Sequence, residues 1–69
     1  MRISARNIIA GKIVEIIKGA TTAHIKLEIG NGVVLTASIT NESVDELALA
    51  VGKSASAIIK SSDVMIGVD

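Results

Sequence analysis

The chain has 69 residues, 49% of them hydrophobic and none aromatic, and its seven basic and seven acidic residues leave no net charge. Without a basic surface or aromatic stacking platforms, it is poorly suited to bind nucleic acids. No cysteine and only one histidine are present, which excludes disulfides, thiolate metal sites and a multi-histidine metal site within one chain.

The length predicts one domain spanning residues 1–69. A domain this small buries only roughly 60% of its unfolded surface, so a lone chain would be marginally stable. The high apolar content therefore predicts burial between subunits. Polar residues directly after Met1 argue against a signal peptide, and no apolar stretch approaches the roughly 20 residues of a membrane span. We expect a soluble cytoplasmic protein.

The run from Ile8 to Ile17 is rich in β-branched residues and predicts a strand that is apolar on both faces. Such a strand is buried on both faces, and in so short a chain the second cover suggests a partner subunit. Gly11 predicts a bulge or bend, and a turn is expected at Lys18 to Ala20. Simple alternation would place Ile8, Val14 and Ile16 on one face and Ile9, Ile13 and Ile17 on the other.

The segment from Thr21 to Ile29 alternates between apolar and polar residues, which predicts a half-buried strand. The turn residues Gly30-Asn31-Gly32 follow, and Val33 to Thr40 is then expected to be the partner strand of a hairpin. Ala23, Ile25, Leu27 and Ile29 are expected to share one face of the first strand, and Val33, Leu35, Ala37 and Ile39 one face of the second.

Between Thr40 and Leu49 the apolar spacing becomes helical, and Thr40 or Asn41 can cap the start of a short helix. Acidic residues crowd its early turns, where the helix dipole favours them. The helix is expected to end at Val51 to Lys53. Two last short strands are predicted at Ser54 to Ile59 and Val64 to Val68.

This order predicts an all-β fold: a small five-stranded barrel of the oligonucleotide-binding type, with one short helix between strands three and four. Periodicity alone leaves an open β-sandwich or another small barrel almost equally compatible with the pattern.

Two segments at opposite ends of the chain each combine one cation with a hydroxyl: Ser4-Ala5-Arg6-Asn7 and Lys60-Ser61-Ser62. A tetrahedral dianion needs two positive charges and several hydrogen-bond donors, which these side chains supply. If the fold or a subunit interface joins the two segments, the chain has an oxyanion site. Each cation considered alone would more commonly be a solvated surface charge.

Several motifs resemble a known family in their order along nearly the whole chain. They are ISARN at Ile3 to Asn7, GKI at Gly11 to Ile13, KG at Lys18-Gly19, ITNESVDEL at Ile39 to Leu47 and AIIKSSDVMIGV at Ala57 to Val68. This order closely resembles the molbindins, small cytoplasmic molybdate-binding proteins built from the Mop domain, which is part of the wider TOBE set.

The resemblance implies a homohexamer, a trimer of dimers, that binds molybdate or tungstate between subunits for intracellular molybdenum storage or homeostasis. Molybdenum would be bound only as the oxyanion, with no catalytic cofactor and no metal site. By the same resemblance, the oxyanion site falls on Ser4, Ala5 and Arg6 of one subunit and on Thr40, Ser43, Lys60 and Ser61 of its partner.

The residue types fit this ligand. Thr40 and Ser43 lie where a helix start exposes backbone N–H groups, and Ala5 could contribute only its own N–H. Molybdate offers only acceptors, whereas partly protonated phosphate would bring an unmatched donor at a cost of about 1–3 kcal/mol. Sulfate is the harder rival, because only its smaller size distinguishes it.

A different class of function is a non-catalytic oligomerisation or regulatory module that docks on a partner protein. An enzyme is not expected, because the only histidine, His24, lies in the middle of a strand without a nucleophile.

Overall fold

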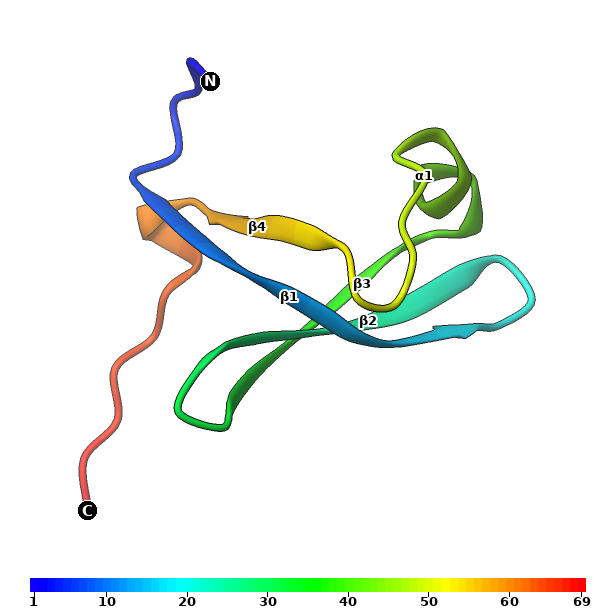
Figure 1. Cartoon of the computed structure of the whole chain (residues 1–69). Helices are drawn as coiled ribbons and strands as arrows, with labels where there is room; N and C mark the ends of the chain where they lie inside the picture. Colours follow the sequence, from blue (N-terminus) through cyan, green and yellow to red (C-terminus); the bar gives the residue numbers. More distant parts are fainter.

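Four antiparallel strands form one curled sheet in the order β3-β2-β1-β4 (Figure 1). The computed structural model describes residues 1–69. Its elements are β1 (Asn7–Lys18), β2 (Thr22–Gly30), β3 (Val33–Thr40), α1 (Asn41–Glu46), β4 (Ser54–Ile59) and a 3₁₀ turn, η1 (Ser61–Asp63). The predicted mostly-β class is confirmed, as is the single short helix between the third and fourth strands.

The hairpin of β2 and β3 is confirmed, with a register that runs from Thr22 opposite Thr40 to Gly30 opposite Val33. The alternation predicted for β2 determines its burial: Ala23, Ile25 and Leu27 are buried, and every second residue between them is exposed. Asn31 has a φ of 51°, a conformation that asparagine tolerates well in tight turns.

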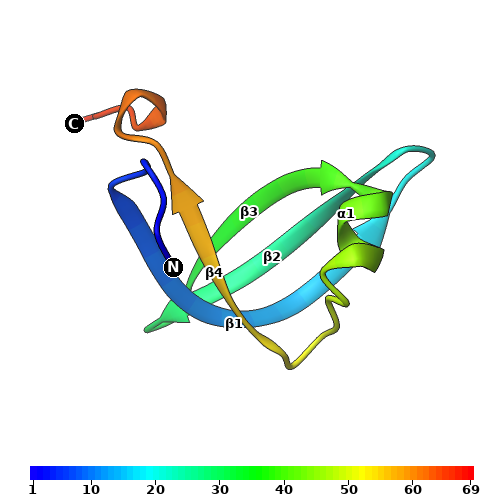
Figure 2. The same ribbon diagram turned by 90° about the horizontal axis from the view of Figure 1, so that it is seen from above.

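Strand β1 is long and strongly bent, so that it pairs with β2 along one half and with β4 along the other (Figure 2). The pairing with β2 shifts between Ile13 and Glu15, which makes Val14 the extra residue of a β-bulge. The bulge reverses the alternation, so Ile16 packs against the core with Ile13, while Ile17 is exposed. The strict alternation expected for this strand was therefore wrong beyond Ile13.

Gly11 serves close backbone approach rather than the predicted bulge. A Cβ atom at this position would collide with the carbonyl oxygen of Glu28 and lie 3.0 Å from the side chain of Leu27. Only a residue without a side chain lets β2 pass this close to β1 at position 11.

Helix α1 ends earlier than the predicted limit near Val51. Ala48 has a φ of 52°, and its N–H bonds to Asp45 while the N–H of Leu49 bonds to Val44, as in a Schellman motif. A left-handed alanine costs about 1–2 kcal/mol, and such a residue ends a helix. Two carbonyls at this end accept hydrogen bonds from Lys53 Nζ, those of Leu47 at 3.3 Å and Ala48 at 3.0 Å.

The fifth strand predicted at Val64 to Val68 is absent from the sheet of this chain. After η1 these residues extend away from the body without a ladder partner (Figure 1). Their side chains are largely exposed, with Met65 at 92% and Val68 at 94%. The pattern of the segment is that of a strand, but no sheet edge of the same chain lies beside it.

Only five residues are buried, and all five are aliphatic: Ile13, Ala23, Ile25, Leu27 and Val44. The outer face of β1 was expected to be covered, yet in one chain Ile8 and Ile17 are about half exposed, at 48% and 55%. Both faces of β1 are apolar, but its own chain covers only the face that carries Ile13 and Ile16.

Candidate oxyanion site

The first strand brings the two cation-bearing segments of the sequence together within one chain. Asn7, which follows Arg6, is paired with Ile59, which precedes Lys60, at the end of the β1–β4 ladder. The side chain of Asn7 reinforces this rung, because its Nδ2 donates a 3.2 Å hydrogen bond to the carbonyl of Ile59. Arg6 and Lys60 thus leave the sheet from adjacent strand ends.

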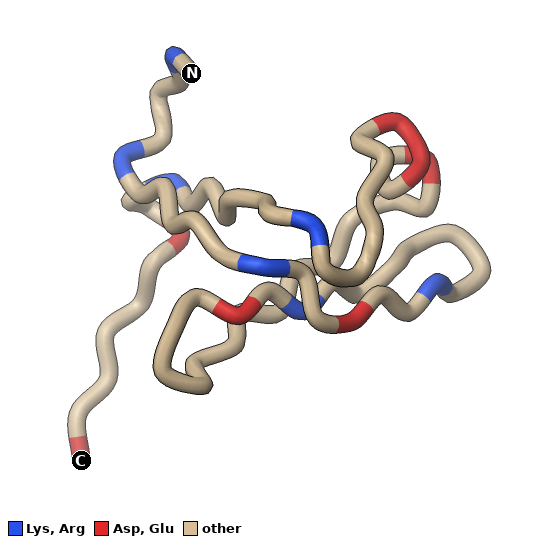
Figure 3. The backbone as a smooth tube through the Cα atoms, viewed as in Figure 1, with Lys and Arg blue, Asp and Glu red and all other residues tan.

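Neither Arg6 nor Lys60 is neutralised by an acid of its own chain. The two ion pairs of the chain use other cations: Lys18 lies 2.8 Å from Asp45, and Lys26 lies 3.9 Å from Glu15. Both Arg6 and Lys60 are exposed, and they lie next to the paired residues Asn7 and Ile59. Figure 3 shows basic segments at the end of the sheet from which the two termini extend. Two cations are therefore free to bind a dianion at this end.

Hydroxyl and backbone donors accompany these two charges. Ser4 and Ser61 are exposed, and neither hydroxyl hydrogen-bonds to another group of the chain. Ala5, half-buried between Ser4 and Arg6, offers only its backbone N–H. We call Ser4, Ala5, Arg6, Lys60 and Ser61 the cationic group.

One acid near the cationic group was missed by the sequence reasoning. Asp63 lies in η1, where its N–H donates to the carbonyl of Lys60 at 2.9 Å. Its carboxylate makes no ion pair with Lys60. Asp63 is exposed, so its charge is screened by solvent.

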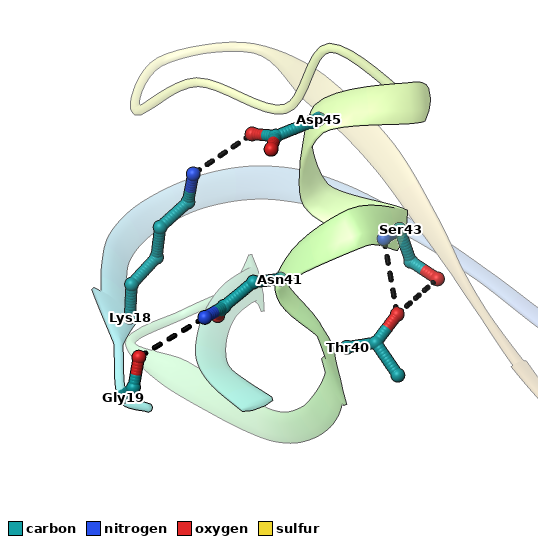
Figure 4. Close-up of polar contacts among 6 residues, drawn as sticks. All are labelled: Lys18, Gly19, Thr40, Asn41, Ser43 and Asp45. Atoms are coloured by element: carbon teal, nitrogen blue, oxygen red, sulfur yellow. Dashed lines mark hydrogen bonds and ion pairs between the residues drawn. The ribbon is translucent and has the colours of Figure 1, made fainter. Parts of the chain in front are cut away.

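At the start of α1, Thr40 and Ser43 are hydrogen-bonded to each other twice (Figure 4). Thr40 Oγ1 accepts from the Ser43 N–H at 3.0 Å, as an N-cap, and donates to Ser43 Oγ at 2.9 Å. The bond between the two hydroxyls uses one of their two protons, so the other proton is free to donate outward. We call these two residues the hydroxyl pair.

The cationic group and the hydroxyl pair lie at opposite ends of β1. Thr40 is opposite Thr22, beside the Lys18 end of β1, whereas Lys60 follows the strand paired with Asn7, at the other end. Figures 1 and 2 both show α1 far from η1. The fold of one chain therefore groups Lys60 and Ser61 with Arg6, not with Thr40 as the resemblance had implied.

Two asparagines that support these groups were not among the predicted site residues. Asn7 holds the strand ends that carry Arg6 and Lys60, and Asn41 anchors the helix start. Asn41 was considered only as a possible cap, and the sequence offered no sign of its contact 22 residues away.

No group of three His, Cys, Asp or Glu side chains is placed to hold a metal ion. None of the helices is long and apolar enough to cross a membrane.

Residues 3–66 match the family model of the TOBE domain. Across all 69 residues, the chain is 48% identical to the whole of a probable molybdenum-pterin-binding protein of Haemophilus influenzae.

Two solved structures share the fold closely. A molybdate-binding protein from Sporomusa ovata superposes with a TM-score of 0.92 and 34% identity, over 99% of this chain and all of that one. The cytoplasmic molybdate-binding protein ModG, solved with molybdate bound, superposes with a TM-score of 0.95 and 45% identity. That match covers all of this chain and 49% of ModG.

Proposed function

The chain belongs to the TOBE-domain family, in the group of Mop or molbindin proteins, and we propose that it binds molybdate between the subunits of a homo-oligomer. The carrying observation is the pairing of β1 with β4, which places two unpaired cations, Arg6 and Lys60, on adjacent strand ends. We further propose tungstate as an alternative ligand and intracellular molybdenum storage as the role.

In the proposed site, the cationic group of one subunit faces the hydroxyl pair of another. Arg6 and Lys60 balance the two charges of the dianion, and Ser4, Ser61 and the backbone N–H of Ala5 add neutral donors. The hydroxyl pair donates the one hydroxyl proton that its internal hydrogen bond leaves free. Every contributing group is a donor, which suits an oxyanion that carries no proton.

The exposed surface supports an assembled state. The chain exposes 5351 Å², whereas a monomer of its mass would typically expose about 4,100 Å². The excess of about 1,250 Å² is of the size that stable interfaces remove from each partner, roughly 600–1,000 Å² or more. Burial of this surface against other copies of the chain would also cover the outer face of β1, which its own chain leaves exposed.

The tail, residues 64–68, follows η1 and pairs with no strand of its own chain, so it could form one of the contacts between copies. An apolar groove of about 570 Å³, lined by 17 residues of which 13 are hydrophobic, opens between β3 and β4. The apolar residues of the tail, Val64, Met65, Ile66 and Val68, have no partner in their own chain. A tail from another copy would complete a five-stranded barrel, and a homohexamer arranged as a trimer of dimers is the assembly that the family resemblance implies.

The names of the relatives include a pterin, which would be a different ligand. This chain has no aromatic side chain on which a pterin ring could stack. Its unengaged hydroxyls at Ser4 and Ser61 instead lie near Arg6 and Lys60 in the sequence, a combination that suits a small anion. The binding is proposed to be non-catalytic, and a cytoplasmic location agrees with the description of ModG as a cytoplasmic protein.

Titration calorimetry of the oligomer with four anions tests this function. Molybdate and tungstate should bind, while phosphate should bind at least tenfold more weakly, because a hydroxyl of the site that accepts the phosphate proton presents its oxygen to the ligand in place of its own proton. Sulfate at tenfold excess should compete only partly. If molybdate gives no binding at any pH between 6 and 8, the storage function is wrong, and the oligomerisation module becomes the better account.

A further inference from the structure

Helix α1 is too short to hold its own position. It has six residues, of which only Val44 is buried, and isolated helices need roughly 12–15 residues to be even marginally stable in water. The position of the hydroxyl pair therefore depends on what fastens α1 to the sheet.

Asn41 makes two hydrogen bonds to the turn between β1 and β2. Its backbone N–H donates to the carbonyl of Thr21 at 3.0 Å, and its side-chain Nδ2 donates to the carbonyl of Gly19 at 3.0 Å (Figure 4). The turn is itself closed, since the N–H of Gly19 donates to Thr22 at 2.7 Å. A carbonyl can only accept, so the amide must face Gly19 with its nitrogen.

The orientation of this amide is set by one of its two polar atoms. Within the chain, Asn41 Oδ1 is buried and has no hydrogen-bond partner, whereas Nδ2 is bonded to Gly19. Most buried polar atoms in proteins have a partner. The bond to Gly19 is therefore the only side-chain hydrogen bond that orients Asn41 within its own chain.

A second tether, the ion pair of Lys18 with Asp45, acts farther along the helix. Its side chains are 47% and 70% exposed, and exposed ion pairs contribute little to stability. Asp45 also lies beyond the first turn, away from Thr40. The ion pair is therefore a useful comparison: it joins the same two elements without fixing the helix start.

We propose that Asn41 is a positioning residue for the oxyanion site. Its amide fixes the first turn of α1 on the β1–β2 turn, and this sets the direction in which the hydroxyl pair, with Ser43 as its helical member, faces a ligand held by another subunit. Asn41 does not itself touch the ligand. That the positioned group contacts an oxyanion rests on the proposed function. That Asn41 holds Ser43 in place does not.

A double-mutant cycle on molybdate affinity separates positioning from general stability. Asn41→Ala should weaken binding about tenfold in the otherwise unchanged oligomer, but less than twofold when Ser43→Ala is already present. Asp45→Asn, the matched control, should change affinity less than twofold. If Asn41→Ala weakens binding equally with and without Ser43, or not at all, the proposal is overturned.

Amide hydrogen exchange in the ligand-free protein tests the placement without any oxyanion. Asn41→Ala should speed exchange of the Ser43 N–H, which bonds to Thr40, about tenfold, and Asp45→Asn should leave it within twofold. An unchanged Ser43 amide in Asn41→Ala would overturn the proposal. Faster exchange in a protein that binds no molybdate would uphold the positioning and reject the proposed function.

Discussion

Replacing Arg6 with glutamine should weaken molybdate binding by one to two orders of magnitude while leaving the oligomer assembled, and Lys60→Gln should do the same. Hydrogen bonds to charged groups contribute about 1.5–3 kcal/mol each, which corresponds to a roughly tenfold to 150-fold change in affinity. Neither side chain makes an ion pair or hydrogen bond within its chain, so removing either should cost little stability. Calorimetry and sedimentation of the same samples would measure both quantities.

Lys12→Gln provides the matched control. Lys12 is also exposed and also free of an ion pair, but it lies within β1, opposite Glu28 and Ser54, whereas Arg6 and Lys60 lie just outside strand ends. It should change molybdate affinity less than threefold. Equal losses from all three substitutions would mean that the net charge of the oligomer attracts the anion, and no specific pair of cations would be needed.

Gly11→Ala should destabilise the protein by about 3 kcal/mol, at the upper end of what overpacking usually costs. The added Cβ atom would collide with the carbonyl oxygen of Glu28 and crowd Leu27, one of the five buried residues. Backbone cannot move aside as a side-chain end can, so β1 and β2 would have to separate. Urea unfolding at a fixed protomer concentration measures the change.

The sign of the change in unfolding free energy for Gly11→Ala distinguishes a close approach of the two strands from an ordinary strand position. In an ordinary strand, glycine is destabilising by roughly 0.5–1 kcal/mol relative to alanine, so Gly11→Ala would then raise stability. A stabilising result would contradict the close approach of β1 and β2. A destabilising one would show that the glycine is required by the curl of the sheet.

Periodicity predicted the β2–β3 hairpin well, because one buried and one solvated face impose strict alternation on a short strand. The bulge at Val14 was missed. Every residue from Ile13 to Ile17 except Glu15 is apolar, so the sequence shows no alternation from which a change of register could be detected. The helix end was missed because Ala48, not a glycine, adopts the left-handed conformation. The tail at Val64 has the pattern of a strand, but that pattern does not say which chain supplies the neighbouring strand.

The cations of the candidate site could be named from the sequence, but their arrangement could not. Arg6 and Lys60 are adjacent because β1 pairs with β4, a contact across more than 50 residues that no local pattern encodes. For the same reason, the supporting bonds of Asn7 and Asn41 emerged only with the fold. Whether the hydroxyl pair of another subunit meets the cationic group remains a prediction.

Native mass spectrometry of the purified protein, with molybdate and then with excess sulfate, would test the proposed binding of molybdate by an oligomer. We expect a six-chain species that retains several molybdate ions in the presence of sulfate. A hexamer that takes up no oxyanion would contradict the binding function. A monomer would contradict both the assembly and the explanation given for the exposed apolar surface.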